Sequence, residues 1–458
     1  MKICSIHIKG FQQFQDTFLD FTHPETGEPL DKICLIGKNG TGKSTILLLI
    51  DKIIRRRTSE INDTSINSLV ILKIENDDNF IYECYMQINV LSDLQTSQQP
   101  IYLLGQIDEI PNWKDLLYLE KNRVDFINSN FSKYDLPQQL QVKLRSSSSD
   151  LFIQIPSESV SNSYLQTSDV PITSMNAALN IFKSFPFYHI ISSEHSVEFW
   201  NLLIYHLKKS DEDQKVFENL PENLNKTKRQ LIEEFDQRNP KILTKIGELW
   251  NRILDHTGLE FDVEGASNPI QLTDNLKAYI KVKATGERIQ YNQLSTGIRN
   301  FIFRLGHIYS LYFNREIKRG FLLVDEPENS LFPDFLYDLI DIYHEITMDK
   351  NGKNNTQSFF ATHNPIIAAQ FEPYERIILE WNAEGTVVAH KGVAPLGDDP
   401  NDLLKKDFEV RSLMGTVGVE KHKEYLTLRR ELRNTSDEEK KKELLSKIGE
   451  IARAYEFD

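Results

Sequence analysis

The chain has 458 residues, of which 40% are hydrophobic, so it is long enough for two or three folded units with a sizeable core. Its formal net charge of −14 opposes nucleic-acid binding by the chain as a whole, so DNA contact would need a local patch or a partner. No apolar run approaches the roughly 20 residues that span a bilayer, and the N-terminus lacks a secretory pattern. The three cysteines lack CxxC spacing and indicate buried free thiols. These features predict a globular cytoplasmic protein without a membrane partner.

The first 54 residues predict antiparallel strands followed by a strand, a loop and a helix. Apolar positions alternate over residues 2–8 and 17–21, which is typical of short antiparallel strands. A core strand is expected over residues 32–36 and a helix is expected to continue to residue 54. The loop between them reads GKNGTGKST.

This loop matches the phosphate-binding pattern GxxxxGK[ST] in its required place between a strand and a helix. Its glycines let backbone amides surround a phosphate, and the helix N-terminus adds partial positive charge. Lys43 is expected to pair with the β- and γ-phosphates of ATP, and the Ser44 hydroxyl to bind Mg²⁺. The predicted ATP-binding residues are Gly37, Lys38, Asn39, Gly40, Thr41, Gly42, Lys43, Ser44 and Thr45.

The middle of the chain changes character several times. Strands of a hairpin are expected over residues 69–75 and 80–90, whereas Ser, Gln, Asn and Pro over residues 92–175 predict loops between short elements. A strand follows over 186–193, and then a helical block over 197–258 with breaks at Pro221 and Pro240. A hairpin turning at Thr285-Gly286 leads into Leu-Ser-Thr-Gly at the start of another helix.

A P-loop needs a carboxylate on a neighbouring strand to hold magnesium, and two segments offer one. LLGQIDE at 103–109 is interrupted by Gln106, whereas GFLLVDEPENSL at 320–331 has four apolar residues before Asp325 and Glu326. We therefore predict that Asp325 orders Mg²⁺ through its water and that Glu326 orients the attacking water. Two adjacent acids at a buried strand end are costly unless a cation is near, which favours the same segment.

The segment FFATHNPIIA, at 359–368, predicts another short buried strand that ends in a polar turn. A lone histidine is usually structural. The position of His363 at the end of the apolar strand that follows Asp325 favours a place beside Glu326, where it can hydrogen-bond the γ-phosphate or the attacking water. The predicted catalytic residues are Glu326, His363 and Lys43.

In this order, the P-loop, LSTG, VDEP and ATHNP resemble the nucleotide-binding heads of ABC-type ATPases, in the branch that contains SMC, RecF and OLD proteins. Within that branch the chain resembles ATPase subunits of bacterial anti-phage systems, Septu first and PARIS second. The resemblance covers about residues 1–90 and 276–400. It implies an α/β fold, an ABC-type P-loop ATPase head in which a mixed core sheet is joined by antiparallel N-terminal strands.

The same resemblance predicts four regions. Residues 1–196 would form the N-terminal lobe of the head with a loop-rich insertion, and residues 197–275 a helical insertion. Residues 276–400 would form the C-terminal lobe, and residues 401–458 a C-terminal helical segment available for partner docking. The separation between Lys43 and Ser295 is much longer than in transporter ATPases, so a transporter is not expected.

The resemblance also implies roles for residues outside the P-loop. Ser295 and Gly297, with Thr296 between them, match the Ser and Gly of the signature that binds the γ-phosphate of ATP held by a second copy. Thr296 replaces the usual first glycine and Ile298 the usual glutamine. The stretch that touches the opposite active site matches Glu328, Asn329, Leu331 and Pro333. The Q-loop glutamine is not assigned among the candidates Gln106, Gln138, Gln139 and Gln141.

We therefore expect an ATPase, which converts ATP and water to ADP and phosphate with Mg²⁺, and which works as a head-to-tail dimer or higher assembly of identical copies. No acidic cluster of the TOPRIM kind follows His363, and the histidines and cysteines do not form an HNH arrangement. The resemblance thus implies control of a separate nuclease or toxin subunit, such as an HNH or TOPRIM nuclease, in anti-phage defence.

Two other functions remain open. The chain could be a RecF- or SMC-like DNA repair ATPase that binds DNA directly, and the basic run at residues 55–57 with Lys52 is a candidate DNA-facing patch. A solvated helix end that complements the helix dipole is the alternative for that run. The altered signature also permits a nucleotide-sensing scaffold with low turnover.

Overall fold

The computed structural model describes most of the chain outside the Ser-rich and Gln-rich middle. The candidate Q-loop glutamines and residues 56–57 of the basic run lie outside the described part. The described residues are 1–55, 67–76, 79–88, 99–105, 149–157, 187–192, 206, 209–239, 241–262, 280–289, 293–313, 315–329, 331–349, 351–408, 410, 412–455 and 457.

The chain divides into two compact units, Met1–Gly397 and Asp398–Asp458. The first unit contains a seven-stranded sheet in the order β15-β14-β3-β13-β12-β7-β8. Every neighbouring pair is parallel except β14 and β15. The strands are β3 Lys32–Gly37, β7 Asp150–Ile155, β8 Tyr188–Ile190, β12 Arg319–Asp325, β13 Thr356–Thr362, β14 Arg376–Trp381 and β15 Val387–Lys391.

The centre of this sheet is covered on both faces, which explains its composition. All seven residues of β13 are buried, as are the five inner residues of β12, and parallel strands in this position read as continuous apolar runs. This mixed sheet and the antiparallel strands beside it confirm the predicted α/β fold class.

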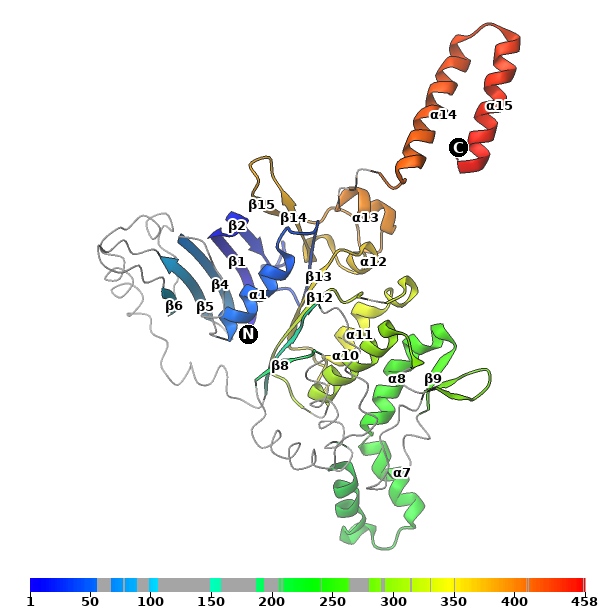
Figure 1. The fold of residues 1–458 in the computed structure, drawn as a ribbon. Helices are drawn as coiled ribbons and strands as arrows, with labels where there is room; N and C mark the ends of the chain where they lie inside the picture. The colour runs from blue at the N-terminus through cyan, green and yellow to red at the C-terminus, as the bar shows by residue number, and fades with distance from the viewer. Residues whose placement is uncertain are drawn as a thin grey trace. The chain divides into compact units, whose positions relative to one another are not determined.

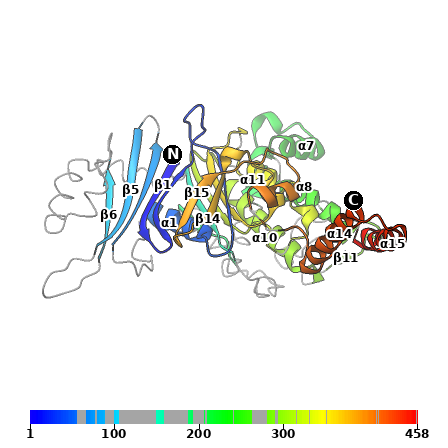
Figure 2. The same cartoon turned by 90° about the horizontal axis from the view of Figure 1, so that it is seen from above.

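A five-stranded antiparallel sheet, in the order β2-β1-β4-β5-β6, forms the other layer. Its strands are β1 Lys2–Phe11, β2 Phe14–Asp20, β4 Asn67–Asn76, β5 Asn79–Ile88 and β6 Gln99–Gly105. Helix α1, Lys43–Ile54, contacts β3, β12 and β13 as well as β4 and β5, so it is packed between the two sheets, as Figure 1 and Figure 2 show. Ile46, Leu49, Ile50 and Ile53 of α1 are fully buried in this shared core.

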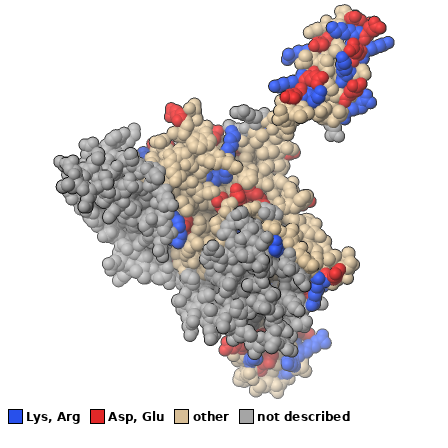
Figure 3. Space-filling model, viewed as in Figure 1, with Lys and Arg blue, Asp and Glu red and all other residues tan. Residues whose placement is uncertain are grey.

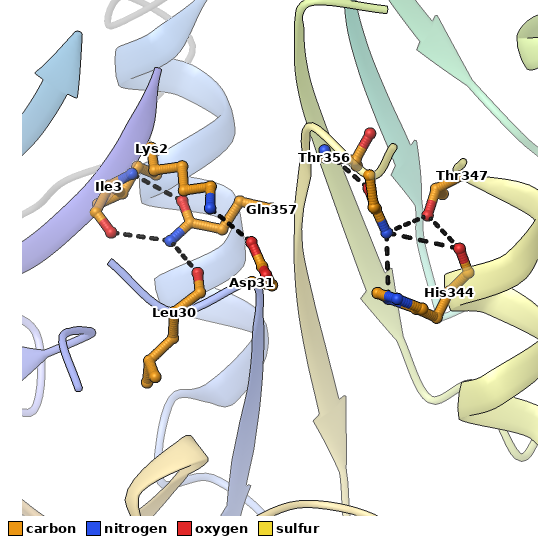
Figure 4. Close-up of polar contacts among 9 residues, drawn as sticks. Lys2, Ile3, Leu30, Asp31, His344, Thr347, Thr356 and Gln357 are labelled. Atoms are coloured by element: carbon orange, nitrogen blue, oxygen red, sulfur yellow. Dashed lines mark hydrogen bonds and ion pairs between the residues drawn. The ribbon is translucent and has the colours of Figure 1, made fainter. Parts of the chain in front are cut away.

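A buried side-chain amide ties the two sheets together (Figure 4). Gln357 of β13 accepts the Ile3 backbone N–H at 2.6 Å and donates to the carbonyl oxygens of Ile3 and Leu30, both at 2.9 Å. Gln357 is fully buried, so its amide supplies hydrogen-bond partners to backbone groups that water does not reach. Strand β1 is thereby fixed against the first residues of β13.

Helices α10 and α11 lie on the opposite face of the seven-stranded sheet from α1 (Figure 1). Helix α10 contacts α8 and α11, and α8 contacts the small antiparallel sheet β11-β10-β9. The hairpin turn of that sheet contains Gly286 with φ of +69°, as expected for a tight turn. Further elements of this unit are α7 Lys228–Arg238, α8 Ile242–Leu254, β9 Leu259–Phe261, β10 Ile280–Val282, β11 Arg288–Ile289, α10 Thr296–Tyr312, α11 Leu339–Ile346 and α12 Pro365–Ala368.

The part of the chain that was expected to contain mainly loops contributes to both large sheets. Strand β6 adds an edge to the antiparallel sheet, and β7 pairs in parallel with β12 in the core. The run DLFIQI at residues 150–155 has five buried residues of six, which is why it forms a core strand despite its polar flanks.

The second unit consists of α13 Pro400–Lys406, α14 Thr416–Asn434 and α15 Glu438–Tyr455. Helices α14 and α15 pack against one another, with Tyr425 and Leu444 buried and the Phe457 ring 5.6 Å from that of Tyr425. Lys and Arg alternate with Asp and Glu over this unit (Figure 3). Across the described residues, no helix has both the length and the apolar content needed to cross a membrane.

Replacing Gln357 by Leu tests the connection between the sheets. The substitution would leave one N–H and two carbonyl groups buried without partners, so we expect a loss of about 3 kcal/mol or more in the free energy of unfolding. The control is Gln214→Leu, because the Gln214 amide donates to Glu218 four residues away on a half-buried helical surface. Urea unfolding measures both variants, and equal losses would contradict the role of Gln357.

Candidate nucleotide-binding site

The P-loop connects the carboxyl end of β3 to the first turn of α1. Gly37, Gly40 and Gly42 have φ of +153°, +83° and +95°, values that a residue with a side chain adopts only with strain. A Cβ atom on Gly42 would lie 2.3 Å from Gln13 Nε2 and 2.4 Å from Phe14 Cζ. The loop is thus packed against the β1–β2 turn at Gly42. Both conformation and space require glycine at positions 37 and 42, whereas conformation alone requires it at position 40.

Lys43 is held inside this loop. Its Nζ donates to the Gly37 carbonyl oxygen at 2.7 Å, with the Lys38 carbonyl oxygen at 3.4 Å. Burial lowers the pKa of Lys43, and the carboxylates of Asp325, Glu326 and Glu328 oppose that shift. The ammonium is therefore poised between the loop and the acids that follow β12, where a phosphate that entered the loop would meet it. Of the other loop residues, Thr41 is buried, while Lys38, Asn39, Gly40 and Ser44 are exposed and Thr45 is half-buried.

Strand order explains why Asp325 reaches the P-loop. Strand β13 lies between β3 and β12, with Thr362 opposite Ile36 and Asp325 opposite Ala361, so the three carboxyl ends meet at one edge. The Ser44 hydroxyl hydrogen-bonds Asp325. Burial raises the pKa of Asp325, and this hydrogen bond opposes the rise.

The Ser44 and Asp325 oxygens are the kind of ligands that Mg²⁺ prefers. In the described parts of the chain, no cluster of three or more His, Cys, Asp or Glu side chains is arranged to hold a metal ion. The pair therefore suits an ion that takes its other ligands from nucleotide phosphates and water. The alternative acidic segment is placed elsewhere: β6 ends at Gly105 in the antiparallel sheet, and Asp108 and Glu109 lie outside the described residues.

Glu326 has an unusual backbone conformation, with φ of +50°. Such a conformation costs about 1–2 kcal/mol for a residue with a side chain, and it is maintained here by a 2.8 Å hydrogen bond from the Glu326 N–H to the Ala361 carbonyl oxygen. The carboxylate points to the edge, where its Oε2 accepts the Ser157 hydroxyl at 2.6 Å. Backbone strain maintained by the surrounding structure is common at functional sites.

His363 follows β13 and lies beside the acids. Its Nδ1 is 3.6 Å from Glu326 Oε1 and 3.7 Å from Glu328 Oε1, and its side chain is 55% exposed. The structure thus brings together Lys43, Ser44, Asp325, Glu326 and His363, five residues that the sequence motifs single out.

Ser295, Thr296 and Gly297 begin helix α10. The Ser295 hydroxyl caps this helix by accepting the Ile298 backbone N–H at 3.4 Å, which leaves its own proton free to donate to an anion. Ser295 is exposed, and the first turn carries no acidic residue. Among the described residues, no hydrogen bond joins these three residues to the P-loop of the same chain.

Comparison with known proteins adds a family to this geometry. A family model described as an AAA ATPase domain matches residues 1–368, which includes the P-loop, Asp325 and His363. The chain belongs to this AAA ATPase domain family. Among solved structures, it is similar to the SMC head domain from Thermotoga maritima, with 13% identity, a TM-score of 0.40, and coverage of 86% of this chain and 100% of that one. No curated protein matches the chain.

Membership of this family confirms the predicted protein class, a P-loop ATPase. The likeness to ATPase subunits of anti-phage systems stays a prediction. Sequence reasoning missed two features of this AAA ATPase domain. Ser157, which contacts Glu326, follows β7 in a Ser-rich segment that reads as a loop, and only the preceding apolar run signals a strand. Glu328, which the resemblance assigns to the stretch that touches the opposite active site, is only 7% exposed and accepts the Thr362 hydroxyl of its own chain at 2.6 Å, a contact that no local pattern indicates.

Replacing Gly42 by Ala tests the packing of the P-loop in this AAA ATPase. The new methyl group would meet Phe14, which is fully buried and cannot move aside. We expect Gly42→Ala to lower the free energy of unfolding by about 2 kcal/mol more than Gly286→Ala, which has a similar positive φ but open space around it. Urea unfolding of both variants measures the difference, and matched losses would show that the contact with Phe14 is unimportant.

Proposed function

We propose that this chain binds ATP with Mg²⁺ and hydrolyses it to ADP and phosphate. The observation that carries the proposal is the convergence of Lys43, Ser44 and Asp325 with Glu326 at one edge of the seven-stranded sheet. A phosphate-binding loop, an oxygen pair for Mg²⁺ and a carboxylate able to orient water are the parts that phosphoryl transfer to water requires.

Each residue has a distinct role in this proposal. The P-loop amides and Lys43 bind the β- and γ-phosphates, and Ser44 and Asp325 hold Mg²⁺, which neutralises phosphate charge when bound. Glu326 orients and polarises the attacking water, with the Ser157 hydroxyl fixing one of its oxygens. His363 donates a hydrogen bond to the γ-phosphate or the water from beside Glu326.

The complete site is proposed to need two copies of the chain. The exposed start of α10 is suited to an anion, because the helix N-terminus carries partial positive charge and the Ser295 hydroxyl proton is available. The absence of a bond between Ser295–Gly297 and the P-loop, within the described residues, is consistent with a ligand held by another copy. Two heads would then enclose two nucleotides, and hydrolysis would separate them.

The biological role proposed for this cycle is control of a separate nuclease or toxin subunit in anti-phage defence. This step is supported by the motif resemblance to Septu and PARIS ATPase subunits. The neighbouring reading frame decides it: an HNH or TOPRIM nuclease, or a toxin, is expected there, and a DNA-repair operon would contradict it.

Direct DNA binding, as in RecF- or SMC-like repair ATPases, is the second candidate. Arg55 of the basic run makes a two-point contact with Asp51 at 2.6 and 2.7 Å and lies over the Tyr188 ring, while Lys52 is 3.6 Å from Asp51. These intrachain contacts favour the structural interpretation of both cations. ATP-dependent and salt-dependent binding to duplex DNA by the chain alone would support the repair function instead.

Glu326→Gln tests the proposed hydrolysis. The amide keeps the shape of the side chain but cannot polarise water as a carboxylate does, so ATP binding should persist while turnover falls by roughly 100-fold or more. The variant should also remain associated in the presence of ATP and Mg²⁺, as measured by analytical ultracentrifugation.

The matched control for Glu326→Gln is Glu345→Gln, because Glu345 also pairs with a basic side chain, Arg252, but lies near the end of α11, beside the residues that lead into the start of β13 and opposite the P-loop edge. This control should keep wild-type turnover. Normal turnover in Glu326→Gln would remove Glu326 from the mechanism. Negligible turnover in the wild-type chain, with ATP binding retained, would favour the nucleotide-sensing scaffold.

Ser295→Arg tests the second half of the site. The larger side chain should obstruct a neighbour's phosphate and lower steady-state ATPase activity by about tenfold or more, while ATP binding to the P-loop continues. Thr227→Arg is the control, because Thr227 caps α7 in the same way without belonging to the predicted site. It should lose some stability and keep full ATPase activity.

Mixing two inactive variants, Ser295→Arg and Lys43→Ala, distinguishes a shared site from a site within one chain. With random pairing, half the dimers contain one copy of each, and one of their two sites is intact, so about a quarter of wild-type activity should return. Activity that stays at the level of the separate variants would contradict a site shared between copies.

A further inference from the structure

Glu328 has a polar environment that defines the role of each of its oxygens. Its Oε1 accepts the Thr362 hydroxyl at 2.6 Å and the His363 backbone N–H at 3.3 Å. The Thr362 Oγ itself accepts the Asn364 backbone N–H at 2.9 Å, so the single hydroxyl proton of Thr362 is directed to Glu328. Glu328 Oε1 therefore holds the turn that follows β13, directly at Thr362 and His363 and through the Thr362 hydroxyl at Asn364.

The other oxygen is in a different situation. Glu328 Oε2 is buried and, among the described residues, has no hydrogen-bond partner. A charged oxygen in such a place would be costly, whereas the hydroxyl of a neutral acid carries only the smaller cost of one unpaired polar group. Burial also raises the pKa of Glu328, and the Thr362 hydrogen bond and the charge of His363 only oppose that rise.

The groups around Glu328 come from several elements. His363 follows β13, Lys43 begins α1, Cys34 lies in β3, and Tyr343 of α11 is close enough to interact electrostatically. The two acids beside His363 differ, because Glu326 is 35% exposed and hydrogen-bonded by Ser157, whereas Glu328 is 7% exposed. Of these two acids, only Glu326 is exposed enough to contact water.

We propose that Glu328 is a positioning residue that acts as a neutral carboxylic acid, whose carbonyl oxygen holds the Thr362–Asn364 turn and so sets His363 opposite Glu326. The role assigned to His363 rests on the proposed ATP hydrolysis. The role of Glu328 in fixing the turn stands on the hydrogen bonds alone.

Glu328→Gln and Glu328→Ala distinguish a neutral acid from a charged one. Glutamine reproduces the carbonyl oxygen and the shape of a protonated glutamate, so kcat should stay within about twofold of wild type. Alanine removes the acceptor, so kcat should fall about tenfold or more while the KM for ATP changes by less than about twofold. Adding His363→Ala to Glu328→Ala should lower kcat little further, because both substitutions remove the same contribution, that of a correctly placed His363.

The control is a second buried acid. Glu375 is 8% exposed, and its pKa is also raised by burial, but it lies 3.5 Å from Lys32 at the opposite end of β3 from the P-loop. Glu375→Ala should lower the free energy of unfolding and leave kcat unchanged. Circular dichroism checks that each variant is folded, and Glu328→Gln keeps the test decisive if the alanine variant fails to fold.

Hydrogen exchange provides a readout that does not depend on activity. The His363 amide, which donates to Glu328, should be protected in the wild type and in Glu328→Gln and should exchange at least about tenfold faster in Glu328→Ala. Equal loss of kcat in the glutamine and alanine variants, or unchanged exchange in alanine, would overturn the proposal. A wild-type chain without ATPase activity would refute the proposed function instead, and exchange would still decide the role of Glu328.

Discussion

The parallel alignment of β3, β13, β12 and β7 is the constraint on which the candidate site depends. Their carboxyl ends meet at one edge, so residues from four distant parts of the sequence become neighbours without long loops. The P-loop follows β3, His363 follows β13, Glu326 follows β12 and Ser157 follows β7. Strand order, rather than sequence distance, decides which side chains share the chemistry.

Charge at this edge is balanced so that a cation and a phosphate can both be accommodated. Three acids and one buried lysine lie within electrostatic reach of one another, and desolvation disfavours the charged forms of Lys43, Asp325 and Glu328. A neutral Glu328 removes one negative charge from this set. A bound Mg²⁺ would offset the charge of Asp325, and a phosphate would offset that of Lys43.

The motifs could be predicted from sequence because each is contiguous and lies at a junction between elements. GKNGTGKST and VDEP each combine an apolar strand with the polar residues that follow it, so the local pattern contains most of the information. The apolar run of β7 signals a strand, but its pairing with β12 and the contact of Ser157 with Glu326 could not be predicted, because both depend on residues more than 150 positions away in the chain. The state of Glu328 likewise depends on burial by other segments, which its own neighbours in sequence do not indicate.

Helix α10 fixes the proposed signature residues, Ser295–Gly297, relative to the edge that holds the P-loop. Fourteen of its 17 residues are buried, so its position is set by packing along its whole length rather than by the loop before it. Within it, Arg304 is 6% exposed and donates to the Pro156 carbonyl oxygen at 3.4 Å, directly before the serine that hydrogen-bonds Glu326. The helix that begins at Ser295 and the carboxylate of Glu326 are therefore parts of one packed body. A second copy that engaged Ser295 would meet a surface whose geometry is already set by the site behind it.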